Sequence, residues 1–328
     1  MSENNSENNV VLRAKGLQKY FPTKKAGQFV KAVDGIDFSI MKNEVVGLVG
    51  ESGSGKSTTA YMVMGMHSIT GGELTFNGED ITMPVAKRAL PLKRDMQIVF
   101  QDPGTSLNPQ RTIGSIISTP LKVHKIVPRN KVTDRVVELL EMVGLSSQTM
   151  YKNPKALGGG ERQLVAIARA LSTNPSLMVL DEPSSALDVS IQAKIINMLM
   201  SLQQQLSMSY LFITHDMSLM RNIADRIAIM YLGRIMEMAP TVEFFSNPRH
   251  PYTKMLLSSI PVVLESERSV LPDKVPSKGE IPSPVNVPTG CRFHTRCPYA
   301  FDKCLSVEPE VREVSPNHTV TCHLESQE

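Results

Sequence analysis

The stretch EVVGLVGESGSGKST, residues 44–58, decides the fold class of this chain of 328 residues. Its first part, EVVGLVG (44–50), is a continuous apolar run of the kind that forms a fully buried strand. Its second part, GESGSGKST (50–58), has the residue spacing of a phosphate-binding P-loop, and a segment compatible with a helix follows it. A buried strand, a P-loop and a helix in this order predict an α/β nucleotide-binding fold.

The P-loop offers three kinds of contact to a bound nucleotide. Its glycines allow backbone N–H groups to wrap the phosphates, Lys56 reaches the β and γ oxygens, and the Ser57 hydroxyl ligates Mg²⁺. The residues that we assign to nucleotide binding in this loop are Gly50, Ser52, Gly53, Gly55, Lys56, Ser57 and Thr58.

Two adjacent carboxylates end a second apolar run, LMVLDEP (177–183). Such a pair is unfavourable at a strand end unless a cation or a substrate uses it. Asp181 is suited to hold Mg²⁺ through water, and Glu182 to orient or deprotonate an attacking water. The pair therefore predicts the catalytic side of a phosphate-hydrolysing site.

Two more polar side chains follow apolar runs. His215 ends FITHD (212–216), where an imidazole can touch a γ-phosphate, and Gln101 lies in IVFQDPGTSLNP (98–109). Each has an ordinary structural interpretation on its own, as a core histidine and as a loop amide. In combination with the P-loop and the carboxylates, both are candidate site residues.

Strand-like and helix-like segments alternate along the chain. Alternating runs between Val10 and Met41 predict antiparallel strands, and continuous apolar runs at 175–183 and 209–216 predict buried strands. Residues 133–145 and 190–206 have apolar residues at helical spacing. We expect a mostly parallel sheet covered by helices.

The pattern fades after Tyr231. Proline recurs too often at 271–288 for a helix or a central strand, so this segment is expected to be a linker or an extended wrap.

The composition excludes several classes of protein. A net charge of +3 and the lack of a dense Lys/Arg stripe argue against nucleic acid as a partner. Residues 1–9 have neither a basic nor an apolar signal region, so we expect a disordered tail and a protein that stays in the cytoplasm. No run of about 18 uncharged apolar residues is present, so a role at a membrane requires a partner.

All four cysteines lie near the end of the chain, in GCRFHTRCPYAFDKC (290–304) and TCHLE (321–325). Clustered thiols in the cytosol favour a metal over disulfides, and thiolates suit an iron–sulfur cluster or Zn²⁺, with unliganded thiols as the third possibility. Arg292 and Arg296 are suited to offset the charge of a thiolate-ligated cluster. The proposed metal ligands are Cys291, Cys297, Cys304 and Cys322.

The motifs together resemble the ATPase subunit of ATP-binding cassette (ABC) transporters. Their order is the P-loop, FQDP, the glycine-rich LGGGE (157–161), LDEPSSALD (180–188) and ITHD, and they span most of Val10 to Tyr231. The resemblance implies a RecA-like core with an antiparallel β subdomain, in a nucleotide-binding domain at residues 10–240, and a helical subdomain at about 103–170. It also implies a head-to-tail dimer in which each ATP lies between one subunit's P-loop and the other's signature turn.

The resemblance also assigns roles to single residues. Gln101 senses the γ-phosphate, ligates Mg²⁺ with Ser57 and Asp181, and couples to the membrane subunits through the segment from Asp102 to about Ile117. Asp188 communicates across the dimer, and His215 contacts the γ-phosphate. Phe21 or its neighbour Tyr20 stacks on adenine.

The signature turn departs from the family pattern, which is Leu-Ser-Gly-Gly-Gln or close to it. Gly159 and Gly160 are kept, Glu161 replaces the usual Gln, and Gly158 stands where the serine belongs. Losing that hydroxyl removes a hydrogen bond to the partner's γ-phosphate, worth about 1.5–3 kcal/mol.

We therefore expect a heterodimer with unequal sites. The site that uses Lys56, Asp181 and Glu182 of this chain should hydrolyse ATP, and the partner's site, completed by Gly158, should bind ATP and turn over slowly. The alternative is a functionally neutral change at Gly158, natural or engineered.

The C-terminal part, at residues 241–328, is similar to the extension of dipeptide and oligopeptide importer ATPases. The similarity lies in NPRHPYTKMLLSSIP (247–261), the proline-rich stretch and the cysteine pattern. Relatives in that group carry a four-cysteine [4Fe–4S] site, and some of them move nickel chelates or oligosaccharides instead of peptides. The resemblance implies as partners a second ATPase subunit, two permeases and an extracytoplasmic binding protein, with this chain peripheral at the cytoplasmic face of the membrane.

Two other functions compete with transport. A soluble ABC ATPase of ribosomes usually holds two cassettes, and one of DNA repair carries long coiled coils between the P-loop and the signature; neither feature occurs in the sequence. A metal-sensing ATP-binding regulator would not need Glu182 and His215. The sequence therefore favours an energy-coupling subunit of a transporter.

Overall fold

The computed structural model describes residues 9–185, 187–260, 275 and 279–326. Most of the expected N-terminal tail, and residues 271–274 and 276–278 of the proline-rich segment, lie outside these residues. The chain divides into two compact units. Unit 1 comprises Met1–Val11, Met41–Glu44 and Met83–Phe212, and unit 2 comprises Leu12–Ile40, Val45–Thr82 and Ile213–Glu328.

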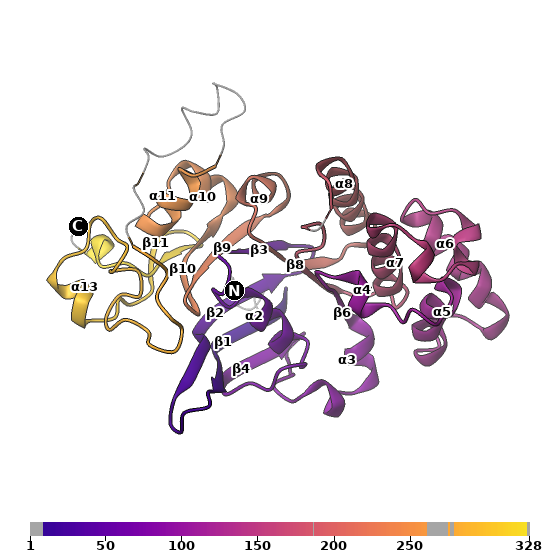
Figure 1. Cartoon of the computed structure of the whole chain (residues 1–328), viewed down its shortest axis with the longest axis horizontal. Helices are drawn as coiled ribbons and strands as arrows, with labels where there is room; N and C mark the ends of the chain where they lie inside the picture. The colour runs from indigo at the N-terminus through magenta and orange to yellow at the C-terminus, as the bar shows by residue number, and fades with distance from the viewer. Residues whose placement is uncertain (1–8, 186, 261–274, 276–278, 327–328) are drawn as a thin grey trace, which may run out of the picture. The chain divides into compact units, whose positions relative to one another are not determined.

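Unit 1 contains neighbouring strands in the order β8-β7-β6 (Figure 1). The sequence predicts β7 and β8 as buried strands but makes no prediction for β6. Strands β6 and β7 run parallel, with Met96 opposite Leu177. Every residue of β7 is buried, and so is every residue of β8. The strands are β6 Met96–Val99, β7 Leu177–Asp181 and β8 Ser209–Thr214, whose last two residues belong to unit 2.

The helices of unit 1 include a helical cluster, in which α5, α6 and α7 pack against one another (Figure 1). Helices α5 and α6 bury their apolar faces, and α7 buries Val165, Ile167 and Leu171. The helices are α3 Leu90–Asp95, α4 Pro103–Ser106, α5 Ile113–Val123, α6 Val132–Met142, α7 Gly159–Leu171 and α8 Val189–Leu206. Short 3₁₀ turns lie at Val85–Lys87, Arg129–Lys131, Ser147–Tyr151 and Pro154–Ala156.

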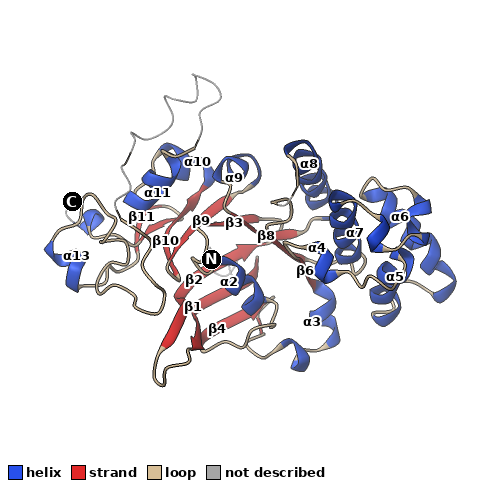
Figure 2. Ribbon diagram, viewed as in Figure 1, coloured by secondary structure: helices blue, strands red, loops and turns tan. Residues whose placement is uncertain are grey.

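Unit 2 contains a four-stranded sheet in the order β2-β1-β4-β5, drawn as red arrows in Figure 2. Strands β1 and β4 are antiparallel, with Leu12 opposite Phe76, and β4 and β5 are antiparallel too. The strands are β1 Val10–Pro22, β2 Phe29–Met41, β4 Gly71–Phe76 and β5 Glu79–Asp80. The predicted pair of strands between Val10 and Met41 is confirmed.

A second set of strands in unit 2 has the order β11-β12-β10-β9-β3. Strands β3 and β9 are parallel, whereas β9, β10, β12 and β11 pair antiparallel in turn. The strands are β3 Val45–Val49, β9 Arg226–Tyr231, β10 Arg234–Pro240, β11 Arg312–Ser315 and β12 His318–Val320. Two strands of this set therefore come from the cysteine-bearing tail.

The helices of unit 2 pack along these strands. Helix α9 contacts β3, α10 contacts β9 and β10, and α11 contacts β10 (Figure 2). Their bounds are α2 Lys56–Val63, α9 Met217–Ile223, α10 Thr241–Ser246, α11 Pro251–Leu257 and α13 Asp302–Ser306, with a 3₁₀ turn at Leu324–Ser326. Regular structure thus continues past Tyr231, where the sequence pattern fades. The pattern of β10 is hard to recognise because a bulge between Ile235 and Glu237 interrupts its alternation.

Candidate nucleotide-binding site

The P-loop has a backbone that only glycine accommodates at two positions. Gly50 and Gly55 have φ angles of 150° and 112°. A Cβ at Gly50 would lie 2.3 Å from the carbonyl oxygen of Met230, and one at Gly55 would lie 2.3 Å from that of Ala32. The turn therefore packs directly on neighbouring backbone, as a phosphate cradle requires.

Lys56, the first residue of α2, is curled over the loop. Its Nζ donates to the carbonyl oxygens of Gly50 at 2.7 Å and Glu51 at 3.0 Å, and the side chain is buried. The ammonium group is thus placed at the loop, where the N-terminal N–H groups of α2 also favour an anion. Loop and helix together form the geometry of a polyphosphate site.

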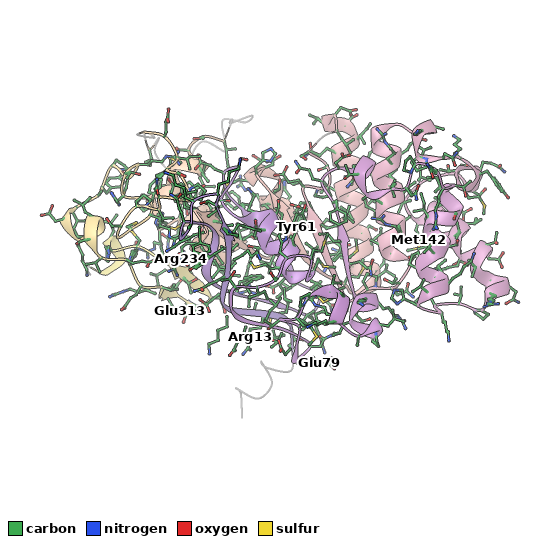
Figure 3. All side chains as sticks on the ribbon, turned by 60° about the horizontal axis from the view of Figure 1, so that its bottom comes forward. Arg13, Tyr61, Glu79, Met142, Arg234 and Glu313 are labelled. Carbon is green, nitrogen blue, oxygen red and sulfur yellow. The ribbon has the colours of Figure 1, made fainter. Side chains whose placement is uncertain are left out.

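The candidate adenine contacts, Tyr20 and Phe21, end strand β1. The Tyr20 hydroxyl donates to Asp34, and burial, together with this carboxylate, raises the pKa of Tyr20 to about 12. The Phe21 ring packs edge-on against His67 at 5.3 Å, and His67 also contacts Tyr61 of α2 at 5.4 Å; Figure 3 labels Tyr61. The Tyr20 hydroxyl is therefore engaged, and Phe21 presents a ring already supported by neighbours.

His215 directly follows β8 and is exposed. It belongs to unit 2 with the P-loop, whereas Gln101, Asp181, Glu182 and the signature turn belong to unit 1.

Unit 1 brings two predicted catalytic residues together. The Gln101 side chain donates from Nε2 to Oε2 of Glu182 at 3.0 Å. Glu182 has a left-handed φ of 46°, which is unfavourable for a residue with a side chain and is typical of functional sites. Asp181 is the last residue of β7 and is buried. The two carboxylates thus differ in environment, as distinct metal-binding and base roles require.

Asp188 caps the N-terminus of α8. Its Oδ1 accepts from the Ile191 N–H at 3.1 Å and from the Ser190 hydroxyl at 2.8 Å. These hydrogen bonds lower the pKa of Asp188, and the one from Ile191 has the largest effect, so the carboxylate is an anion at neutral pH.

The signature turn forms the start of α7, with Gly158 at the cap position. The Gly158 N–H donates to Oε2 of Glu161 at 3.0 Å, so one half of a capping box is present and the serine half is missing. A Cβ at Gly160 would lie 2.9 Å from Ile191, whereas one at Gly158 would meet no heavy atom closer than 3.8 Å. Gly160 is therefore required by packing, and Gly158 is not.

The four cysteines lie in one part of unit 2. Cys291, Cys304 and Cys322 are buried, and the Cys291 N–H donates to the Cys304 carbonyl oxygen at 2.9 Å. Burial, followed by the charge of neighbouring thiols, raises the pKa of Cys291 to about 11 and that of Cys322 to about 12. Within the described residues, no three His, Cys, Asp or Glu side chains are arranged to hold a metal ion.

The two arginines of the cysteine segment do not serve the role expected from the sequence. Arg292 pairs with Asp34 and Arg296 pairs with Glu51, so carboxylates outside the segment neutralise them. Sequence reasoning missed Glu51, whose position in the P-loop motif accepts any residue and so gave no signal.

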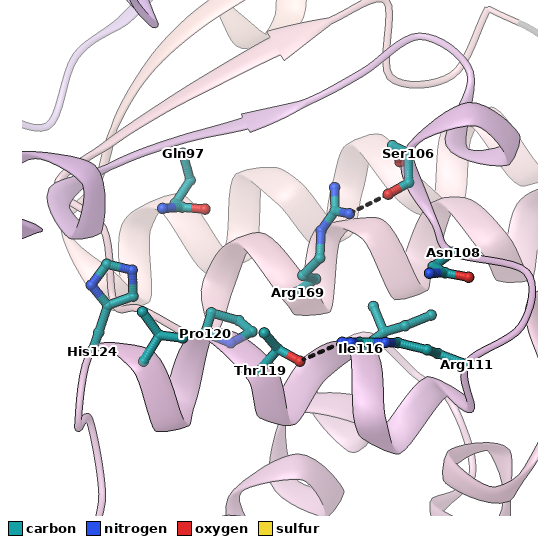
Figure 4. Close-up of a pocket in the computed structure, with 10 residues that line it drawn as sticks. Gln97, Ser106, Asn108, Arg111, Ile116, Thr119, Pro120, His124 and Arg169 are labelled. Carbon is teal, nitrogen blue, oxygen red and sulfur yellow. Dashed lines mark hydrogen bonds between the residues drawn. The ribbon is translucent and has the colours of Figure 1, made fainter. Parts of the chain in front are cut away.

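Unit 1 also has an open pocket of about 380 Å³ beside α5 and α7. Arg169 of α7 donates to the Ser106 carbonyl oxygen at 2.6 Å, and Arg111 donates to the Thr119 hydroxyl at 3.4 Å (Figure 4). Burial lowers the pKa of Arg169.

In the part of the chain that is described, no helix is both long and apolar enough to cross a membrane.

Comparisons with known proteins agree with this geometry. Residues 33–185 match the ABC transporter family, and residues 236–304 match the C-terminal region of oligopeptide/dipeptide transporters. The oligopeptide transport ATP-binding protein AppF of Bacillus subtilis is 45% identical, over 96% of this chain and 98% of that protein. The dipeptide transport ATP-binding protein DppF of Haemophilus influenzae is 40% identical, over 98% and 99% of the two chains.

Solved structures share the fold. The cbiO1 protein of Clostridium perfringens, part of the cbiONQ ABC transporter complex, matches with a TM-score of 0.63 and 25% identity over 73% of this chain and 92% of that one. An ATP-binding cassette in a dimeric, post-hydrolysis state with ADP and Pi matches with a TM-score of 0.62 and 26% identity over 70% and 98%. The chain therefore belongs to the family of ATP-binding subunits of ABC transporters, in the oligopeptide and dipeptide group.

Proposed function

We propose that this chain hydrolyses ATP to drive the import of peptides through a membrane ABC transporter. The observation that carries the proposal is the presence, in one chain, of a P-loop cradle and a C-terminal region of the oligopeptide/dipeptide transporter type. The relatives AppF and DppF named above are an oligopeptide and a dipeptide transport ATP-binding protein, and each aligns with this chain over nearly its whole length. ATP and Mg²⁺ are the ligands that the reaction requires.

The residue roles that we propose are those that the motifs imply. The P-loop residues Gly50, Ser52, Gly53, Gly55 and Thr58 wrap the phosphates. Lys56 binds the β and γ oxygens, Ser57 and Asp181 hold Mg²⁺ with Gln101, and Glu182 activates the attacking water. His215 contacts the γ-phosphate, and Phe21, with Tyr20 beside it, supports adenine. The hydrogen bond between Gln101 and Glu182 supports a common task for these two side chains.

The domain division is proposed on the sequence boundaries. Residues 10–240 form the nucleotide-binding domain, with the helical subdomain at about 103–170, and residues 241–328 form the extension. The helical cluster of α5, α6 and α7 supports a separate helical subdomain. The pairing of β12 with β10 supports an extension that packs on the nucleotide-binding domain within unit 2.

The segment from Asp102 to about Ile117 is proposed to contact a permease. It includes α4 and the start of α5, and several of its residues line the open pocket beside Arg169. The partners proposed are two permeases, a second ATPase subunit and an extracytoplasmic binding protein, with this chain peripheral at the cytoplasmic face of the membrane.

The four cysteines are proposed to hold a [4Fe–4S] cluster, with Zn²⁺ as the alternative. The donor set supports the proposal, since the other three cysteines lie close enough to Cys322 to add to the rise that burial causes in its pKa. All four lie among the described residues, and no three of them are arranged there to hold a metal ion. When bound, the cluster would cross-link the tail and so stabilise it.

Metal analysis tests the cysteine proposal. Anaerobically purified protein is expected to contain about four iron and four sulfide per chain, and the variant Cys304→Ser is expected to lose most of both. The variant His294→Ala keeps all four thiols and serves as the matched control. Zinc without iron or sulfide would assign the site to Zn²⁺, and neither metal would leave the thiols unliganded.

Transport measurements test the proposed function. Vesicles that contain the assembled transporter and its binding protein are expected to take up a labelled peptide only when ATP is supplied. The variant Lys56→Ala should lower uptake by about 100-fold, because the lysine that binds the β and γ oxygens is lost. Lys87→Ala, at an exposed position, is the matched control. ATP-dependent uptake of an oligosaccharide or a nickel chelate instead of peptides would contradict the substrate.

A further inference from the structure

The C-terminal extension holds the acidic side chain of the P-loop. Arg296 donates from Nη1 to Oε2 of Glu51 at 2.6 Å and from Nη2 to Oε1 at 3.1 Å, which is a bidentate ion pair. The Glu51 N–H donates to the Tyr252 hydroxyl at 3.2 Å. Arg296 and Tyr252, both buried, thus fix the side chain and the backbone of the same P-loop residue.

The position of Glu51 gives these contacts a consequence for nucleotide binding. Glu51 directly follows the first P-loop glycine, and its carbonyl oxygen accepts from Nζ of Lys56 at 3.0 Å. An uncompensated carboxylate here would repel the phosphate oxygens of a bound nucleotide, and the repulsion grows where water is excluded. Arg296 supplies the compensating charge, and its two hydrogen bonds hold the Glu51 carboxylate in one position.

The surroundings of Arg296 hold the guanidinium in one orientation. Its Cζ lies 5.7 Å from the ring centroid of Tyr231 and 5.8 Å from that of Phe293, and Nη2 contacts Sδ of Met255 at 3.9 Å. The rings of Tyr231, Tyr252 and Phe293 pack on one another with centroids 4.8–5.4 Å apart. A cation on this aromatic support is preorganised for its partner.

Burial lowers the pKa of Arg296, but the hydrogen bond to Glu51 outweighs burial and raises this pKa above its ordinary value, so the guanidinium keeps its charge.

We propose that Arg296 is a positioning residue for ATP binding, which acts by neutralising Glu51 and fixing the P-loop backbone. The extension would thus complete the nucleotide site of its own chain. This inference rests on the proposed function, in which the P-loop binds ATP.

Equilibrium binding of a fluorescent ATP analogue with Mg²⁺ to the purified full-length chain tests the inference. The variant Arg296→Gln leaves the Glu51 carboxylate unpaired, so we expect the affinity to fall about tenfold or more. Arg296→Lys keeps the charge without the fork and should lose less. The double variant Glu51→Gln with Arg296→Gln removes both charges and should recover most of the affinity.

A second ion pair provides the control. Glu308→Gln removes a 2.8 Å ion pair of the same tail with Arg234 but leaves the pair of Arg296 with Glu51 intact, so nucleotide affinity should be unchanged. The inference is overturned if Arg296→Gln binds within twofold of the unmodified chain, or if Glu308→Gln weakens binding equally. If Arg296→Gln does not fold, Arg296→Lys and the double variant decide the question. Failure of the unmodified chain to bind the analogue would instead contradict the proposed function.

Discussion

Glu182→Gln in this chain alone is expected to lower ATP turnover of the assembled transporter by about 100-fold or more, the usual contribution of a general base. Glutamine keeps the size of the side chain but cannot accept a proton from the attacking water. The contact with Gln101, 3.0 Å in the unmodified chain, can persist through the amide oxygen, so the site keeps its shape. The loss is therefore expected in the turnover number and not in the affinity for ATP.

Steady-state phosphate release from the assembled complex measures this effect. Two comparisons are needed: the equivalent Glu→Gln change in the partner ATPase alone, and Glu138→Gln in this chain. Glu138 lies on α6 and forms an exposed ion pair with Arg135 at 2.9 Å, so its change should leave turnover intact. If the partner's change abolishes turnover while Glu182→Gln does little, the assignment of the working site to this chain is wrong.

The nucleotide-binding elements could be predicted because their signals are local. An apolar run of five residues specifies β3, and the whole P-loop motif lies within the consecutive residues 50–58. The start of α7 follows in the same way from a glycine turn before an amphipathic segment. Where residues a few positions apart decide the structure, the sequence pattern is sufficient.

The contacts of the tail could not be predicted, because they join residues distant in the chain. Arg296 and Glu51 are 245 residues apart, and Arg292 and Asp34 are 258 apart. Beside four cysteines, two arginines suggest charge compensation for a cluster, whereas the fold pairs them with the buried Asp34 and the half-buried Glu51. Strand β10 was missed for a related reason: its bulge breaks the alternation, and its pairing with β12 is not visible locally.

Gly158→Ser is expected to raise turnover at the second ATP site. In the expected head-to-tail dimer, this site lies between the partner's P-loop and the signature turn of this chain. The added hydroxyl restores a hydrogen bond to a charged phosphate, worth about 1.5–3 kcal/mol, which corresponds to about tenfold or more in rate if it acts in the transition state. The turn accepts the change, because Gly158 has an ordinary extended backbone with φ of −68° and open space around its Cβ position. Serine is also favoured at a helix cap, so α7 should not be weakened.

The effect is clearest when this chain's own site is silent. Turnover of the Glu182→Gln complex is therefore compared with that of the double variant Glu182→Gln with Gly158→Ser, in which any gain arises at the second site. Gly158→Ala in the same background adds the Cβ without the hydroxyl and controls for the backbone. A gain with serine but not with alanine assigns the weakness of that site to the missing hydroxyl. Equal turnover of all three complexes would show that Gly158 does not limit the second site, and the two sites of the heterodimer would then differ for another reason or not at all.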